Sequence, residues 1–145
     1  MNTVPPAVTW GPWEAELPPR VWRLARHSRS VGRARGRFRD QAARWRLPED
    51  TAETAVLLLS ELVTNAVRHS HVRGRHIEVR CLVVGGATLR VEVSDAGDGL
   101  PVLRTAADED ESGRGLALVA ALAADWGVQP RPHGIGKTVW CELSL

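Results

Sequence analysis

The feature that most constrains the fold is a pair of β-prone runs joined by two adjacent glycines. Residues 77–84 and 88–94 are rich in β-branched and apolar side chains, and Gly85-Gly86 joins them. Neighbouring glycines supply the positive φ angles that a tight hairpin turn requires. The pattern therefore predicts two antiparallel strands in one sheet.

An amphipathic helix is predicted before this hairpin, with Ser28 or Ser30 as its N-cap and its end near Trp45. Pro48 stops it, because the residue before a proline is disfavoured in helical conformation. Its predicted buried face follows the three-to-four spacing of a helix and consists of Val31, Ala34, Phe38, Ala42 and Trp45.

A second helix is predicted to start at Asp50 and to end near His69. Asp50 is a candidate N-cap, and Glu53 follows three residues later, as in a capping box. The apolar stripe of this helix comprises Ala55, Leu58, Leu59, Leu62, Ala66 and Val67.

The remaining elements complete the sheet and one more helix. Residues 21–25 alternate apolar and basic side chains, as in an edge strand. Residues 116–125 form a predicted helix opened by Gly113-Arg114-Gly115, and residues 126–129 and 137–143 form a last strand pair. Helices and antiparallel strands in this order predict one sheet with helices on one face.

The chain length of 145 residues suits one domain. Five prolines make residues 1–19 a poorly ordered lead-in, so we expect the domain to span 20–145. The longest uncharged apolar run has nine residues, too few to cross a membrane. An N-terminus without a signal-peptide pattern and only two cysteines indicate a cytoplasmic protein.

Charge is unevenly distributed along the chain. Residues 20–46 contain ten arginines and one acid, Asp40. A basic helix is compatible with DNA binding, but no helix-turn-helix or aromatic-basic platform accompanies it. We therefore expect no nucleic-acid partner, and either a solvated arginine face or a surface that meets an acidic partner.

Glu61 and Asn65 are the first candidate site residues. They lie four residues apart and so share one side of the predicted helix, beside Leu58 and Leu62. A carboxylate and an amide next to an apolar stripe are costly to bury unless they bind something. A polar pair at the edge of the stripe is the alternative.

Two glycine motifs follow. Asp95-Ala96-Gly97-Asp98-Gly99 comes directly after a strand, where the aspartate is placed to accept a hydrogen bond from an exocyclic amine. Its alternative is an ordinary Asp-Gly turn. Gly113-Arg114-Gly115-Leu116 opens a helix, where free N–H groups and the helix dipole favour phosphate. Its alternative is a flexible hinge.

Some patterns are excluded as sites. Gly136-Lys137-Thr138 imitates the end of a P-loop, but Arg131 stands where the first glycine is needed and no helix can follow. The five histidines show no metal-site spacing with cysteines or acids. Cys81 and Cys141 fall in predicted strands and are expected to be buried thiols.

In combination, the motifs resemble those of the GHKL ATPase superfamily. Glu61 and Asn65 resemble its N box, residues 95–99 its first glycine box and residues 113–115 its second. The short domain and the run Glu111-Ser112-Gly113-Arg114-Gly115-Leu116 are most similar to the branch of anti-sigma-factor serine kinases. The resemblance implies an α/β two-layer sandwich, the Bergerat fold, with a mixed, mostly antiparallel sheet.

The resemblance also implies how Mg·ATP would be bound. Asn65 would ligate Mg²⁺, and Asp95 would bind the adenine amino group with support from Thr138 through water. Gly97 and Gly99 would shape the adenine pocket. Residues 100–113 would form a lid over the phosphates.

The resemblance assigns the phosphates to Gly113, Arg114, Gly115 and Leu116, and the role of general base to Glu61. The activity implied is a serine/threonine protein kinase that phosphorylates an anti-anti-sigma protein and also holds a sigma factor, as a homodimer. A non-catalytic ATP-dependent switch and an ATPase that needs no partner are the alternatives.

Overall fold

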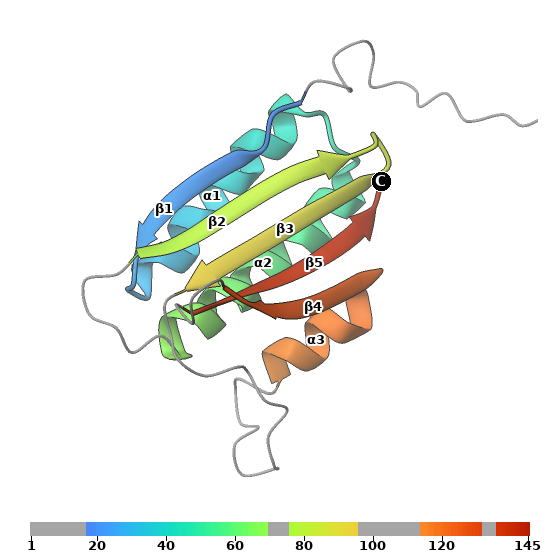
Figure 1. Cartoon of the computed structure of the whole chain (residues 1–145). Coiled ribbons are helices and arrows are strands. Elements are labelled where there is room, and N and C mark those ends of the chain that lie inside the picture. Colours follow the sequence, from blue (N-terminus) through green and yellow to red (C-terminus); the bar gives the residue numbers. More distant parts are fainter. Residues whose placement is uncertain (1–16, 70–75, 96–113, 132–135) are drawn as a thin grey trace, which may run out of the picture.

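Five strands form one sheet in the computed structural model, which describes residues 17–69, 76–95, 114–131 and 136–145. The strands are β1 (Arg20–Ala25), β2 (His76–Val84), β3 (Thr88–Asp95), β4 (Asp125–Pro130) and β5 (Lys137–Ser144). They lie in the order β1-β2-β3-β5-β4 (Figure 1). All of these pairings are antiparallel, so the expected mostly antiparallel sheet has no parallel pair among the described strands.

Three helices, α1 (Arg29–Arg44), α2 (Glu49–His69) and α3 (Arg114–Leu122), lie behind the sheet in Figure 1. The central helix, α2, contacts β2, β3 and β5, while α1 packs on α2 and β1, and α3 packs on α2 and β4. This arrangement confirms the predicted α/β sandwich with its helices on one face.

The hydrophobic core fills the space between these two layers. Alternate residues of each strand point toward the helices, and the predicted apolar stripes of α1 and α2 face the sheet. The central part of the core comprises Phe38, Leu58, Leu59, Leu62, Val63, Ile77, Val79, Leu89, Val91 and Val93, all with side chains almost inaccessible to water.

The opposite face of the sheet carries charged side chains linked across strands. The Arg90 guanidinium donates to Glu92 at 2.7 Å and to Glu142 at 2.8 Å, and it lies 4.1 Å from the centre of the Trp140 ring. Burial lowers the pKa of Arg90, but the hydrogen bonds to these two carboxylates outweigh burial and raise it. This face is therefore held by polar interactions and the helix-covered face by apolar packing.

The predicted hairpin is confirmed. Gly85 and Gly86 have φ angles of 61° and 69°, and the Ala87 N–H donates to the Val84 carbonyl at 3.1 Å. Positive φ at two successive residues is inexpensive only for glycine.

Two predicted helix boundaries are wrong. The helix α2 starts at Glu49, one residue before the proposed N-cap Asp50, so both acids lie in its first turn and face the positive end of its dipole. The last helix ends at Leu122 and not at residue 125, because the Ala124 N–H donates to the Glu142 carbonyl at 2.8 Å and Asp125 begins β4.

Neither serine that we proposed as a cap for α1 acts as one. Ser28 occupies the N-cap position without a capping side-chain hydrogen bond. Ser30 lies inside the helix, where its hydroxyl donates to the Ala25 carbonyl at the end of β1. The contact joins the edge strand to the helix instead.

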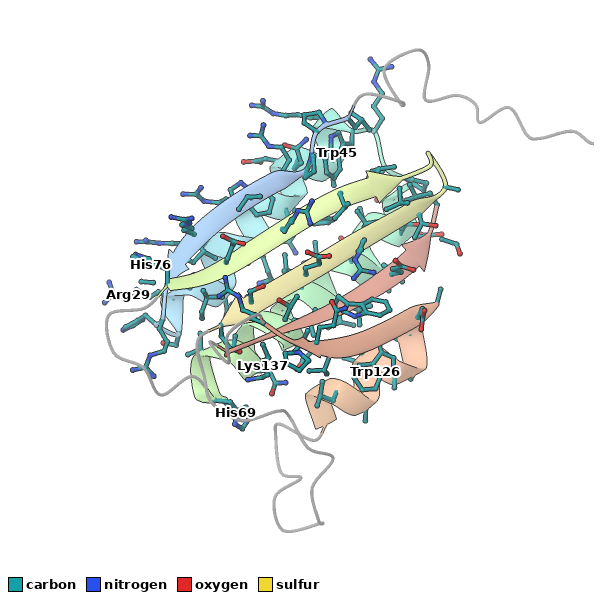
Figure 2. The ribbon with its side chains drawn as sticks, viewed as in Figure 1. Arg29, Trp45, His69, His76, Trp126 and Lys137 are labelled. Atoms are coloured by element: carbon teal, nitrogen blue, oxygen red, sulfur yellow. The ribbon has the colours of Figure 1, made fainter. Side chains whose placement is uncertain are left out.

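The helix α1 presents a basic surface to solvent. All of its arginines are exposed, and Asp40 is its one acid. Figure 2 shows nitrogen-tipped side chains projecting from the edge formed by α1 and β1. This arrangement matches the solvated arginine face that was one of the two expectations from the sequence. No helix of the described residues is long and apolar enough to cross a membrane.

The C-terminus of α1 contains a strained residue. Arg46 has a φ of 55°, and the hydrogen bonds from Arg46 to Ala43 and from Leu47 to Ala42 form a Schellman motif. Glycine occupies this left-handed position at the lowest cost, whereas a side chain with a Cβ is strained there.

We predict that Arg46→Gly stabilises the protein by about 0.5–1 kcal/mol, since relief of the left-handed strain exceeds the added entropy of the unfolded chain. The matched change Arg44→Gly, in the last helical turn, should destabilise it by a similar amount. Urea unfolding measures both free energies. A destabilised Arg46→Gly variant would show that this cap is not under strain.

Candidate active site

A buried ion pair lies where β3 ends and β5 begins. Asp95 and Lys137 are paired in register across the two strands. The Lys137 Nζ lies 3.0 Å from Asp95 Oδ2 and 3.3 Å from Oδ1. The side chains are 1% and 4% exposed for Asp95 and Lys137 respectively. Both belong to the alternating set that points toward the helices.

The cost of this ion pair indicates a role beyond stability. Removing two charges from water costs several kcal/mol per ion, and their attraction seldom exceeds that cost by much. Apolar residues would fill the same space without the penalty. A carboxylate and an ammonium retained in the interior are therefore better explained by binding than by folding.

Thr138, which we expected beside Asp95, lies on the other face of the sheet. Its hydroxyl forms a 2.7 Å hydrogen bond with the hydroxyl of Ser94, on the same side as Trp140 and Glu142. Successive residues of a strand point to opposite faces, so the residue that faces the helices beside Asp95 is Lys137. The expected support of adenine by Thr138 through water is therefore corrected.

The sequence contains a pattern that places Lys137 beside Asp95, although the prediction selected the neighbouring residue Thr138. Val139, Cys141 and Leu143 are apolar and alternate along β5, so period two places Lys137 on their side of the sheet. Lys137 is also the one lysine of the chain. The same alternation, followed back to the start of the strand, selects Lys137.

Glu61 lies against the N-terminus of α3. A Cβ added to Gly115 would come within 2.7 Å of the Glu61 Oε2 atom. A side chain at position 115 would therefore displace the Glu61 carboxylate, which lies close to the Gly115 backbone. The structure thus brings together the N-box glutamate and a residue of the second glycine motif, which are far apart in sequence.

Asn65 lies one helical turn beyond Glu61 on the same side of α2. It is only 7% exposed, although its neighbours in the core are apolar. The helix that carries Glu61 and Asn65 also contacts β3, β5 and α3. Figure 2 shows Lys137 at the end of the molecule where α2 finishes at His69.

Several expected site residues lie outside the described residues. Gly97, Gly99 and Gly113 are among them, as is the whole proposed lid at 100–113. The backbone of Arg114 starts α3, and its side chain is not described. The Leu116 side chain is 5% exposed and packs in the hydrophobic core, where it holds α3 against the rest of the domain.

The buried cysteines offer no nucleophile. Burial raises the pKa of the Cys141 thiol to about 12, and it raises that of Cys81 further, so both thiols stay protonated. Among the residues described, no group of three or more histidine, cysteine or acidic side chains is arranged to hold a metal ion. The candidate site residues whose side chains are described and lie between the sheet and the helices are Glu61, Asn65, Asp95 and Lys137.

Comparison with known proteins identifies the family of this domain. A family model described as a histidine kinase-like ATPase domain matches residues 24–142, and the chain belongs to that family. It is thus a member of the GHKL superfamily, with an ATP-binding domain. An uncharacterised protein of Streptomyces coelicolor is 38% identical over 86 residues, covering 58% of this chain and 79% of the relative.

Solved structures show the same fold. The RsbU and RsbW domains of a Mycobacterium tuberculosis protein match with a TM-score of 0.67 at 21% identity over 88% of this chain. The chain spans only 32% of that protein's chain. A blue-light activated histidine kinase of Erythrobacter litoralis matches with a TM-score of 0.51 at 32% identity, covering 68% of this chain and 31% of the kinase.

The described residues fit an adenine nucleotide. Asp95 offers a buried acceptor at a strand end, and the largely buried Asn65 carries an amide oxygen of the kind that suits a hard cation. At the start of α3, the missing side chain of Gly115 lets the Glu61 carboxylate lie close to the backbone, and free N–H groups of a helix N-terminus attract phosphate.

We predict that Gly115→Ala displaces the Glu61 carboxylate while the protein stays folded, because the far end of a flexible side chain can move. The added methyl group crowds the space beside α3, so ADP affinity should fall by about tenfold or more. Calorimetric titration with ADP measures this effect. Ala117→Ser, an exposed change two residues later, is the control and should leave the affinity unchanged. Equal affinities in both variants would place the nucleotide away from Gly115.

We predict that Thr138→Val lowers stability by about 1 kcal/mol through loss of the bond to Ser94, yet leaves ADP affinity within about twofold. Asp95→Asn, on the opposite face, should weaken ADP binding by about tenfold or more. Thermal unfolding and calorimetry separate the two effects. A loss of ADP affinity in Thr138→Val as large as that in Asp95→Asn would show that Thr138 takes part in nucleotide binding.

Proposed function

We propose that the chain is a Mg·ATP-dependent serine/threonine protein kinase of the anti-sigma-factor type. Its substrate is a serine or threonine hydroxyl on an anti-anti-sigma antagonist protein, and it also binds a sigma factor, acting as a homodimer. The observation that carries the proposal is the close contact between the Glu61 carboxylate and Gly115 at the start of α3. It sets a candidate base beside the expected phosphate-binding end of a helix.

Each residue has a role in this proposal. Asp95 accepts a hydrogen bond from the adenine amino group, and Asn65 binds Mg²⁺ through its side-chain oxygen. Backbone N–H groups in the first turn of α3 hold phosphate oxygens. Gly115, which has no side chain, lets the Glu61 carboxylate lie close to the first turn of α3.

ATP supplies the γ-phosphoryl group. Glu61 accepts the proton of the serine hydroxyl while the serine oxygen forms its bond to the γ-phosphorus. The bond between that phosphorus and the oxygen bridging to the β-phosphate breaks, and ADP leaves with the bonding electrons. Proximity and charge stabilisation supply most of the rate enhancement in such transfers, so the position of Glu61 matters as much as its basicity.

The choice of partner rests on the motifs and not on the fold. The run Glu111-Ser112-Gly113-Arg114-Gly115-Leu116 resembles that of the anti-sigma-factor kinases. A structure that contains RsbU and RsbW domains shares the fold of this chain at 21% identity. The exposed arginines of α1 supply an electropositive surface for an acidic region of a partner.

We predict that Glu61→Ala lowers phosphoryl transfer by about a hundredfold or more, the usual contribution of a general base, and leaves ADP affinity within about threefold. The assay incubates the protein with radiolabelled ATP and candidate antagonist proteins. Glu53→Ala is the matched control, since Glu53 is exposed on α2 about two turns earlier, and it should retain full transfer. Normal transfer by Glu61→Ala would remove Glu61 as the base.

The same assay separates the two alternatives. An ATPase that needs no partner releases inorganic phosphate when the protein is incubated with ATP alone. A non-catalytic switch changes its affinity for a partner when ATP binds, and transfers nothing. Tight ATP binding without transfer to any antagonist would refute the kinase proposal and leave the switch.

A further inference from the structure

We propose that Lys137 is a base-recognition residue, which donates a hydrogen bond to N1 of adenine while its ion-pair partner Asp95 accepts one from the 6-amino group. This role rests on the proposed binding of adenine by Asp95. It adds a second protein contact to the base, and it identifies that contact as an ammonium group and not as the hydroxyl of Thr138.

Lys137 carries more N–H groups than its contacts with Asp95 engage. Its ammonium group has three donors and no acceptor. The contacts with the two carboxylate oxygens of Asp95, at 3.0 and 3.3 Å, engage at most two of them. In an interior where the Lys137 side chain is 4% exposed, water satisfies the third donor poorly. A ligand acceptor beside Asp95 would satisfy it.

The polarity of the ion pair is complementary to one edge of adenine. The edge that carries the 6-amino group places a donor, N6–H, directly beside an acceptor, N1. The ion pair places an acceptor, the Asp95 carboxylate, directly beside a donor, the Lys137 ammonium. Guanine has the opposite order at these positions, an acceptor at position 6 and a donor at position 1. A rigid, buried pair of this polarity therefore selects adenine over guanine.

The strand ladder holds the ion pair firmly in place. Asp95 and Lys137 occupy opposed positions in the β3–β5 ladder. Val93 and Val139, the next residues on the same face of the two strands, are 1% and 4% exposed, and they anchor that rung in the core. A register shift would expose both valines, so the two charged groups keep a fixed order relative to an approaching base.

The test compares ADP with 1-deaza-ADP, in which a C–H group replaces N1. The wild-type protein should bind 1-deaza-ADP about ten- to a hundredfold more weakly than ADP in calorimetric titrations, the usual effect of losing a hydrogen bond to a charged donor. Lys137→Met should bind both nucleotides with equal, weakened affinity. The ratio of the dissociation constants for 1-deaza-ADP and ADP in the wild type, divided by the same ratio in Lys137→Met, isolates the contact between Lys137 and N1.

A double variant controls for the possibility that Lys137→Met fails to fold. Lys137→Met alone leaves the Asp95 carboxylate buried without its ammonium partner, which is strongly destabilising. The double variant Asp95→Asn/Lys137→Met replaces both charges with neutral groups of similar size, and it too should fail to distinguish the two nucleotides. Ser94→Ala, which removes a polar group from the opposite face next to Asp95, should retain the wild-type discrimination.

A second readout needs no mutation. Because Lys137 is the one lysine of the chain, ¹⁵N-lysine labelling gives a single side-chain ammonium signal in an NMR spectrum. Saturation with ADP should shift this signal, and saturation with 1-deaza-ADP should shift it much less.

The outcomes separate the role of Lys137 from the proposed function. If the folded wild-type protein binds neither nucleotide, the proposed ATP-dependent function fails, and the role of Lys137 fails with it. If it binds ADP and 1-deaza-ADP equally, the kinase proposal stands and only the role of Lys137 is overturned. Discrimination that persists in Lys137→Met would likewise overturn it, since another donor would then contact N1.

Discussion

The register between β3 and β5 is the constraint on which the rest of the site depends. Leu89, Val91 and Val93 alternate on β3, and the apolar side chains of β5 meet them on the face covered by helices. The same alternation carries Asp95 and Lys137 to that face at the end of the ladder. A slip of one residue would expose the apolar side chains and move both charges to the other face. Hydrophobic burial thus fixes the position of two polar groups that it does not itself favour.

The helix α2 couples the core to the chemistry in a similar way. Leu58, Leu59 and Leu62 are buried against the sheet, and the same helix carries Glu61 and Asn65 and contacts β5 and α3. The buried leucines thus fix the backbone position from which the Glu61 side chain extends. A close contact with Gly115 completes the arrangement, because the absent side chain leaves the space that the Glu61 carboxylate requires.

Much of this fold could be predicted from periodicity and turn chemistry. The hairpin at Gly85-Gly86, the stripes of both long helices and the layer arrangement depend on local patterns, and the structure confirms them. Boundaries were less predictable, because Ala124 leaves its helix to donate to Glu142, a residue distant in sequence. Thr138 was misplaced since a motif gives an order of residues, whereas the face of a strand depends on alternation along its whole length. The contact of Glu61 with Gly115 depends on tertiary packing and has no local signal.

The burial of Lys137 also bears on which cationic groups the protein exposes on α1. The one side-chain amine of the chain is enclosed in the interior, so every cationic side chain on the exposed face of α1 is a guanidinium. Guanidinium groups do not undergo the lysine acylation that removes charge. The positive charge of this helix is therefore insensitive to lysine acetylation, and a partner attracted to it meets the same electrostatic surface whatever the acetylation state of the cell.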